Sequence, residues 1–178
     1  MIFMNVIKDK PTDFLLDVDG VLTDGGFYYT QSGLTFKKFG QYDTDALKRL
    51  NLLTGIKISF VTSDYKSDIN IRRCHDMDFE CHKCTNPYNR FDWVSQRYIL
   101  EKTIYMGDSF TDYLTFKNVY YSIAPNNAMQ IIKNMVNYKT PSNGGNGAVA
   151  EACIHIYDLF FKKQDEDLID LFTKPIGK

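Results

Sequence analysis

The chain has 178 residues, of which 44% are hydrophobic and 24% charged, with 21 Lys and Arg against 22 Asp and Glu. This composition excludes a disordered chain, a collagen-like repeat and a coiled coil. A formal net charge of −1 supplies no excess of cations for a nucleic-acid backbone, so we expect no nucleic-acid partner. The length suits one domain, and we expect residues 1–178 to form a single one.

No apolar run approaches the roughly 20 residues of a membrane-spanning helix, and the N-terminal run MIFMNVI is too short for the core of a signal peptide. The four cysteines are too few for the disulfide framework of a small secreted domain, so we expect reduced thiols. These features predict a cytoplasmic protein with no membrane partner.

Short apolar runs alternate with longer mixed segments along the chain. The strand-like runs are residues 13–19, 56–62, 102–108 and 120–124. The clearest helix between them is 43–54, with Asp43 as the expected N-cap and Gly55 after its end. Further helices are expected over 88–100, 109–117, 127–136 and 148–162. The alternation predicts a Rossmann-like, three-layer α/β fold around a central parallel sheet.

Residues 27–39 break this alternation. The runs FYYT and LTFKKF flank Gln31, Ser32 and Gly33, a pattern typical of a β-hairpin with a three-residue turn. We expect this hairpin to project from the sheet. The acidic and amphipathic tail, residues 164–178, is expected to be a solvated helix end.

Two acids end the first strand-like run, FLLDVDG. Asp17 and Asp19 are two residues apart, so their side chains leave the same face of an extended backbone, and Gly20 lets the chain turn at once. Open α/β sheets bind ligands at the carboxyl ends of their strands. Because adjacent carboxylates repel each other, the pair favours a site for a divalent cation and an anionic substrate.

A second acidic pair follows another strand, in the segment YMGDSFTD. Asp108 comes after Gly107, and Asp112 lies one helical turn further on. Mg²⁺ is bound by one or two carboxylates together with water and substrate phosphate, so Asp17 and Asp108 from neighbouring strand ends suit it. We expect Asp112 to be a helix-start or network residue.

Hydroxyl groups and a cation complete the set. Thr62 and Ser63, at the end of the strand over 56–62, could donate hydrogen bonds to a phosphoryl oxygen, with help from backbone N–H groups at the following helix start. Arg90 could neutralise the charge of a transferring phosphate.

Acid pair, hydroxyl, cation and acid pair, in that order, resemble the four motifs of the haloacid dehalogenase superfamily of phosphotransferases. The segments DVDGVLTDGGFYY, VTSD, YMGDSFTD and GGNGAVAE, together with the hairpin, resemble its capless branch. That branch includes phosphatases of octulosonate 8-phosphate and of sialic-acid-type 9-phosphates, and the C-terminal domain of animal acylneuraminate cytidylyltransferases. The resemblance covers roughly residues 13–162 and implies a phosphoric monoester hydrolase.

The resemblance also implies a mechanism and a cofactor. Asp17 would attack phosphorus to form an aspartyl-phosphate, while Asp19 would protonate the departing sugar oxygen and then activate water. Mg²⁺ would be held by the side chains of Asp17 and Asp108 and by the backbone carbonyl of Asp19. Thr62 and Arg90 would also take part in catalysis. The residues implied to contact the substrate are Thr62, Ser63, Asp64, Arg90 and Gly145.

The spacing leaves no room for a cap domain. Only 44 residues separate Asp17 from Thr62 and 27 separate Thr62 from Arg90, whereas an independent domain needs at least about 50. A capless site is open to water, so a neighbouring subunit is the natural lid. The resemblance implies a homotetramer in which hairpins pack together and the GGNGAVAE segment reaches an adjacent active site, and the aromatic hairpin strands supply suitable apolar surface.

Several positions depart from the pattern of that branch. Arg90 replaces the usual Lys, Ser109 replaces the second acid of a GDD motif, and Ala150 stands where the late segment usually has Arg. Ser63 and Asp64 replace the usual Gly and the residue after it, and an acid at position 64 favours the nonulosonate side. The catalytic acids are unchanged, so these substitutions bear on the substrate more than on the reaction.

Three functions therefore remain open. The first is a Mg²⁺-dependent phosphatase of octulosonate 8-phosphate or nonulosonate 9-phosphate. The second is an assembly or regulatory domain with little turnover, similar to the cytidylyltransferase domain. The third is a phosphatase for another small phosphate ester.

A cluster of possible zinc ligands lies in the middle of the chain. Cys74, His75, Cys81, His82 and Cys84 offer thiolates and imidazoles at short spacing, but this spacing fits no standard zinc finger. In the branch that the chain resembles, the segment is a helix, a loop and a strand. We therefore expect buried thiols and solvent-facing histidines.

Overall fold

The computed structural model describes residues 10–173, so the N-terminal run 1–7 and the end of the predicted tail, 174–178, lie outside the described residues. Six strands form one sheet in the order β5-β4-β1-β6-β7-β8, and every pairing in it is parallel. The predicted central parallel sheet is therefore confirmed. Its strands are β1 (Asp13–Asp17), β4 (Lys57–Thr62), β5 (Glu80–Lys83), β6 (Thr103–Met106), β7 (Tyr121–Ala124) and β8 (Tyr138–Lys139).

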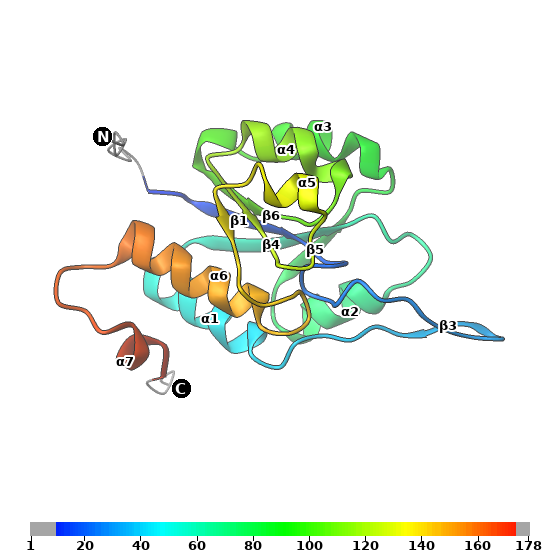
Figure 1. Ribbon diagram of the computed structural model, residues 1–178, viewed down its shortest axis with the longest axis horizontal. Helices are drawn as coiled ribbons and strands as arrows, with labels where there is room; N and C mark the ends of the chain where they lie inside the picture. The colour runs from blue at the N-terminus through cyan, green and yellow to red at the C-terminus, as the bar shows by residue number, and fades with distance from the viewer. Residues whose placement is uncertain (1–9, 174–178) are drawn as a thin grey trace.

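Helices cover both faces of the sheet (Figure 1). The helices α1, α2 and α6 share one core with Phe14 and Leu16 of β1, while α3, α4 and α5 pack with Leu15 on the opposite face. Successive side chains of a strand point to opposite faces, so β1 is apolar throughout because both of its faces are covered. The helices are α1 (Asp43–Thr54), α2 (Ile69–Asp76), α3 (Arg90–Ser95), α4 (Tyr113–Asn118), α5 (Gln130–Lys133) and α6 (Ala148–Ile156).

The predicted helix 43–54 has the observed bounds of α1, and Gly55 ends it with a φ of 71°. The prediction that Asp43 is its N-cap is wrong, because Tyr42 holds that position. The Oδ1 atom of Asp43 instead accepts a hydrogen bond of 3.0 Å from the backbone N–H of Ala150, in the first turn of α6. The carboxylate thus ties two helices together that pack on the same face of the sheet.

The other predicted helices are shorter or interrupted. Single 3₁₀ turns precede α3 and α4, α5 covers only part of 127–136, and a π-helical turn follows α6. Strands β5 and β8 were not predicted from the sequence pattern, although the helix and strand implied by the resemblance are present as α2 and β5. The additional turns are η1 (Pro87–Asn89), η2 (Leu100–Lys102), η3 (Phe110–Asp112) and η4 (Tyr157–Phe161).

The predicted hairpin is present as β2 (Tyr28–Thr30) and β3 (Gly33–Phe36), and it projects from the body of the molecule (Figure 1). Its turn is shorter than predicted, because Gly33 pairs with Thr30 and leaves only Gln31 and Ser32 between the strands. Neither the interval from β1 to β4 nor that from β4 to α3 contains a cap domain, as predicted.

The tail is more than a solvated end. Helix α7 (Leu168–Thr173) places Leu168, Leu171 and Phe172 against the core on the α1 and α6 side of the sheet. The hydroxyl of Tyr157 also donates a hydrogen bond of 2.7 Å to Glu166. Among the described residues, none of the helices has the length and apolarity needed to cross a bilayer.

Candidate active site

Three neighbouring strands deliver polar residues to one edge of the sheet. β1 lies between β4 and β6; Asp17 ends β1, Thr62 ends β4, and Asp108 follows β6 by two residues. The chain winds outward from β1 to β5 and then returns to the other side of β1, which makes this edge a topological switch point where α/β folds bind ligands. A cavity of ≈ 390 Å³ opens here, lined by Asp17, Asp19, Gly20, Gly25, Phe27, Ser63, Asp64, Tyr65, Lys66, Pro87, Arg90, Asp108, Ser109 and Thr111.

Three carboxylates meet beneath this cavity. Asp17, Asp108 and Asp112 each present an oxygen, and these oxygens all lie within 4.8 Å of one another. Asp17 and Asp108 form the pair expected from the sequence. Asp112 has the predicted network role as well, because it completes a capping box with Ser109, and it accepts a hydrogen bond of 2.6 Å from the hydroxyl of Tyr105. Buried carboxylate oxygens at this spacing suit a hard divalent cation.

Charge in this cluster is poorly compensated. Burial, opposed by Arg90 and assisted by the charges of Asp112 and Asp19, raises the pKa of Asp17 to about 7. Burial together with the charges of Asp17, Asp112 and Asp19 raises the pKa of Asp108 to about 8. The shared cause is burial of like charges, which a bound cation would relieve.

Arg90 lies behind the cluster and is almost completely buried. Its Nη1 atom lies 3.3 Å from Oδ1 of Asp17 and 3.0 Å from the hydroxyl of Tyr105, while Nη2 donates to Ser63 at 2.9 Å. The pKa of Arg90 stands above its ordinary value because Asp17, Tyr105 and Asp112 outweigh the effect of burial. A planar guanidinium thus spans contacts that the single nitrogen of a lysine could not make together.

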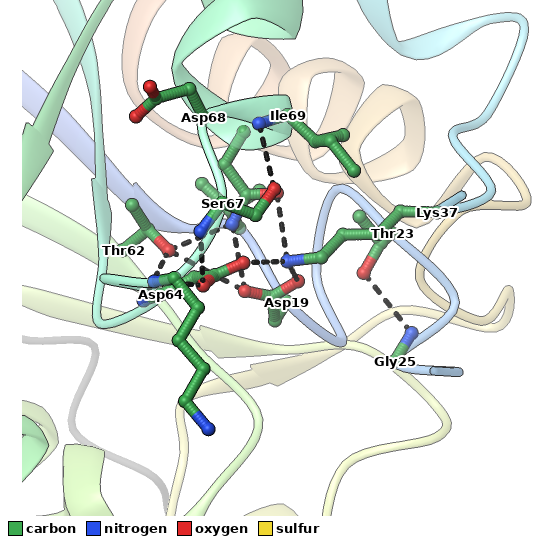
Figure 2. Close-up of polar contacts among 12 residues, drawn as sticks. Asp19, Thr23, Gly25, Lys37, Thr62, Asp64, Ser67, Asp68 and Ile69 are labelled. Atoms are coloured by element: carbon green, nitrogen blue, oxygen red, sulfur yellow. Dashed lines mark hydrogen bonds and ion pairs between the residues drawn. The ribbon is translucent and has the colours of Figure 1, made fainter. Parts of the chain in front are cut away.

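The second acid of the first motif belongs to a different network (Figure 2). The Nζ atom of Lys37 lies 2.7 Å from Oδ1 of Asp19 and 2.8 Å from Oδ2 of Asp64, and it also donates to Asn70 at 3.2 Å. The Nδ2 group of Asn70 donates to Oδ2 of Asp19 at 2.8 Å and to the hydroxyl of Thr62 at 2.8 Å. Asp19 is therefore held on both of its oxygens.

Opposing effects act on the ionisation of this network. Burial tends to lower the pKa of Lys37, but its hydrogen bonds to Asp19 and Asp64 outweigh burial and raise it. Burial tends to raise the pKa of Asp64, yet the hydrogen bonds from Lys37 and from the backbone N–H groups of Lys66 and Ser67 leave it lowered. Both changes favour the ion pair.

The two hydroxyl residues predicted to contact phosphate lie in different places. Ser63 lines the cavity, whereas Thr62 is fully buried beside it. The Thr62 hydroxyl lies 3.5 Å from Oδ2 of Asp19 and accepts from the backbone N–H of Asp64 at 3.1 Å. Ser63 is thus the hydroxyl on the cavity wall, while the role of Thr62 toward phosphate stays a prediction.

Two glycines allow close approaches around the acids. A Cβ atom at Gly20, where φ is 83°, would lie 2.1 Å from Oδ2 of Asp108. Gly145, with a φ of 63°, packs against the loop after β1, where an added Cβ would lie 2.5 Å from the backbone nitrogen of Asp24. Within one chain, Gly145 therefore supports this loop from behind and does not line the cavity.

The positions that depart from the family pattern have partners of their own. Ser109 lines the cavity and bonds with Thr111 and Asp112. Ala150 is half-buried against the core. Neither residue replaces the charge of the acid or the arginine expected at its position.

The cysteine and histidine cluster does not form a zinc site. Cys74 is buried on the α1 and α6 side of the sheet and Cys84 on the opposite side, so they cannot share an ion. His75 is exposed, and His82 lies beside Trp93 with 5.5 Å between ring centroids. In residues 10–173, the three acids described above are the one group of histidine, cysteine or acidic side chains arranged to hold a metal.

Lys37, Asn70 and Tyr105 were missed by sequence reasoning. Lys37 lies in the FKKF run and Tyr105 in a strand, where they look like ordinary hairpin and core residues, and Asn70 is the second residue of α2. No motif marks them. Only the fold brings them to the acids.

Comparisons with known proteins agree with this geometry. A family model described as haloacid dehalogenase-like hydrolase matches residues 95–152. The chain is 33% identical over 166 residues to a 3-deoxy-D-manno-octulosonate 8-phosphate phosphatase of Haemophilus influenzae, with 91% of each chain covered.

Solved structures show the same fold. The cobalt-bound form of the Haemophilus influenzae phosphatase matches with a TM-score of 0.73 and 27% identity, covering 84% of this chain and 88% of that one. A phosphatase of the same name from Moraxella catarrhalis, in complex with magnesium ion, phosphate ion and a KDO molecule, matches with a TM-score of 0.74 and 26% identity, covering 83% and 86%.

Fold, acid cluster and relatives together define the protein as a phosphoric monoester hydrolase. Within that class, the chain belongs to the haloacid dehalogenase-like hydrolases, in the family of the octulosonate phosphatases just described. The resemblance seen in the sequence is confirmed.

Proposed function

We propose that the protein is a Mg²⁺-dependent phosphatase of a phosphorylated sugar acid, with 3-deoxy-D-manno-octulosonate 8-phosphate as the first candidate and a nonulosonate 9-phosphate as the second. The observation that carries this proposal is the group of Asp17, Asp108 and Asp112, of which Asp17 and Asp108 line a cavity together with Asp19 and Arg90. The names of the relatives support the choice of substrate.

The acids present fit a divalent cation. Asp17 and Asp108 would hold it with their side chains and Asp19 with its backbone carbonyl, while Asp112 offers a further oxygen within reach. When bound, Mg²⁺ would screen the charge of the attacking carboxylate from that of the phosphate. The relatives whose structures contain magnesium or cobalt support the use of a divalent ion.

In the first step, an Oδ atom of Asp17 attacks phosphorus and forms a new P–O bond. The bond from phosphorus to the sugar oxygen breaks, and Asp19 gives its proton to that oxygen. Arg90 lies next to Asp17, and Ser63, bonded to Arg90, lines the same cavity, so both can stabilise the negative charge of the transferring phosphoryl group.

In the second step, Asp19 accepts a proton from water, and the oxygen of the resulting hydroxide attacks the phosphorus of the aspartyl-phosphate. The bond between phosphorus and Asp17 breaks, phosphate leaves, and Asp19 is again protonated for the next cycle. Asp19 lines the cavity and is partly exposed, which gives a water molecule access to its carboxylate.

Residue 64 bears on the choice between the two substrates. The carboxylate of Asp64 accepts hydrogen bonds from Lys37, Lys66 and Ser67. Because Lys37 is already paired with Asp64 and Asp19, it is not available to bind the carboxylate of a substrate. The cavity wall has two cations, the buried Arg90 and the exposed Lys66. We therefore propose that Lys66 lies near the carboxylate of the bound substrate.

The decisive experiment measures phosphate release with Mg²⁺ from an aryl phosphate, octulosonate 8-phosphate and a nonulosonate 9-phosphate. We expect release that disappears in Asp17→Asn, with at least about a 10³-fold loss, and the highest kcat/KM for a sugar acid phosphate. Release that is equal in wild type and Asp17→Asn would favour the assembly domain instead. A higher kcat/KM for an unrelated ester would favour the third function, a phosphatase for another small phosphate ester.

We also propose a homotetramer assembled through the hairpin. Phe27, Tyr29 and Phe36 are each more than half exposed, an unusual apolar surface on a projecting element. Replacing all three by serine should lower the assembly mass measured by light scattering. A wild-type monomer with full activity would contradict this assembly and the shared lid.

A further inference from the structure

Lys37 is a buried cation next to the active site that does not line the cavity. Its side chain is 1% exposed, and its ammonium group contacts Asp19, Asp64 and Asn70, which uses all three of its N–H donors. It is the first residue after β3, so it connects the base of the hairpin with the loops that follow β1 and β4 (Figure 2). Burying a lysine is costly, and three polar partners offset that cost.

The contacts of Asp19 show what this cation does. Oδ1 of Asp19 faces Lys37, and Oδ2 receives the amide of Asn70. Among residues 10–173, the side chain that contacts Oδ1 is that of Lys37. The carboxylate thus has one orientation fixed from both sides while its remaining surface faces the cavity.

Resting on the proposed phosphatase function, we propose that Lys37 is a positioning residue, which holds the carboxyl group of Asp19 in the orientation needed for proton transfer to the leaving oxygen. Lys37 touches neither substrate nor phosphate in this scheme. Without it, Oδ1 of Asp19 would lose its partner, and Asn70 would hold the carboxyl group through Oδ2 alone, so that it could turn away from the leaving group. The cation that bridges Asp19 and Asp64 and screens their repulsion would also be gone.

The dependence on the leaving group separates this role from a structural one. An alkyl phosphate, such as a sugar phosphate, needs a proton on its departing oxygen, whereas p-nitrophenyl phosphate releases an acidic phenol that needs little help. Because kcat/KM covers the steps up to loss of the leaving group, it isolates the step in which Asp19 is the acid.

The test compares wild type, Lys37→Met and the control Lys38→Met, whose side chain is exposed on the next residue. For the alkyl phosphate that wild type cleaves fastest, we expect Lys37→Met to lower kcat/KM by about 10- to 100-fold. For p-nitrophenyl phosphate the fall should stay within about threefold, and Lys38→Met should match wild type on both substrates. In an Asp19→Asn background, adding Lys37→Met should cause no further loss with the alkyl phosphate.

An equal fall on both substrates, no fall on either, or a further loss in the Asp19→Asn background would each overturn the positioning role. These results leave the proposed function standing as long as release depends on Asp17. Release that does not depend on Asp17 overturns the proposed function and this inference with it.

If Lys37→Met does not fold, Lys37→Met/Asp64→Asn removes one of the two unpaired acids and is compared with Asp64→Asn alone. The same selective loss on the alkyl phosphate is expected, and an equal loss on both substrates would again contradict the role.

Discussion

The two halves of the active site balance their charges differently. On one side, Arg90 pairs with Asp17 and Asp112, and burial among like charges raises the pKa of Asp17 to about 7 and that of Asp108 to about 8. On the other side, Lys37 pairs with Asp19 and Asp64 at distances below 3 Å. The first half is incomplete without a further positive charge, whereas the second is already paired within the chain. This difference supports the proposed placement of the metal in the first half and of the proton donor Asp19 in the second.

Asp108→Asn, in the half with the acid cluster, should have the largest effect on activity. It removes a metal-binding oxygen, so activity with Mg²⁺ should fall by at least about 100-fold, and Mg²⁺ should no longer raise the melting temperature. The metal-free variant should be more stable than metal-free wild type at about pH 8.5, because one repelling charge is gone. Activity assays and thermal melts with EDTA or Mg²⁺ measure both effects. An unchanged response to Mg²⁺ would place the metal elsewhere, and the exposed Asp45→Asn serves as control.

The pH dependence of stability should also differ with and without metal. Asp17 and Asp108 have folded-state pKa values raised above the ordinary 3.8, so their stabilising contribution is present at low pH and is lost as the pH rises toward about 8. In EDTA, the melting temperature should therefore fall by at least about 5 °C between about pH 5.5 and about pH 8.5.

Mg²⁺ should reverse most of that fall, because it binds the deprotonated carboxylates. A melting temperature in EDTA that rises over the same pH range would show that the acid cluster is compensated in some other way.

A smaller effect, on stability, is expected from Lys37→Met in the paired half. The change leaves Asp19 and Asp64 without their cation, which should cost about 2 to 3 kcal/mol in the free energy of unfolding. The cost stays below that of a fully buried pair because Asp19 is partly exposed. Urea unfolding measures it, and Mg²⁺ should not restore the loss. Restoration by Mg²⁺ would mean that the bound metal can take over the charge compensation of Asp19 and Asp64 from Lys37.

The smallest effect is expected from Tyr105→Phe. The buried hydroxyl accepts from Arg90 and donates to Asp112, so its removal should cost about 1 to 3 kcal/mol of stability and lower activity by about tenfold or less. Tyr98→Phe is a matched control, because its hydroxyl pairs with Ser59 away from the site. Equal activity losses in the two variants would argue against a role for Tyr105 in placing Arg90.

Much of the fold follows from the sequence because its signals are local. The apolar run before Asp17 gives β1, and the stripe ending at Gly55 gives α1 with its exact bounds. The turn of the hairpin and the cap of α1 were wrong, since both depend on partners outside the local sequence. Asp43, for example, accepts a hydrogen bond from the backbone N–H of Ala150 in the first turn of α6, more than 100 residues away along the chain.

The site divides in the same way. Asp17, Asp19, Asp108 and Arg90 lie in motifs, and the fold brings all four to one cavity. Lys37 carries no such signal, because its importance comes from burial between two loops. Sequence reasoning therefore finds groups that motifs mark and misses those that support them from a distance.

The central claim, that Asp17 takes the phosphoryl group covalently, is tested most directly in Asp19→Asn with Mg²⁺ and p-nitrophenyl phosphate. The acidic phenol leaves without a proton donor while hydrolysis lacks its base, so we expect a burst of about one phenol per subunit. Acid quench, borohydride reduction and peptide mass spectrometry should then find residue 17 converted to homoserine. A full burst with residue 17 unmodified, or with another carboxylate modified in its place, would contradict the account.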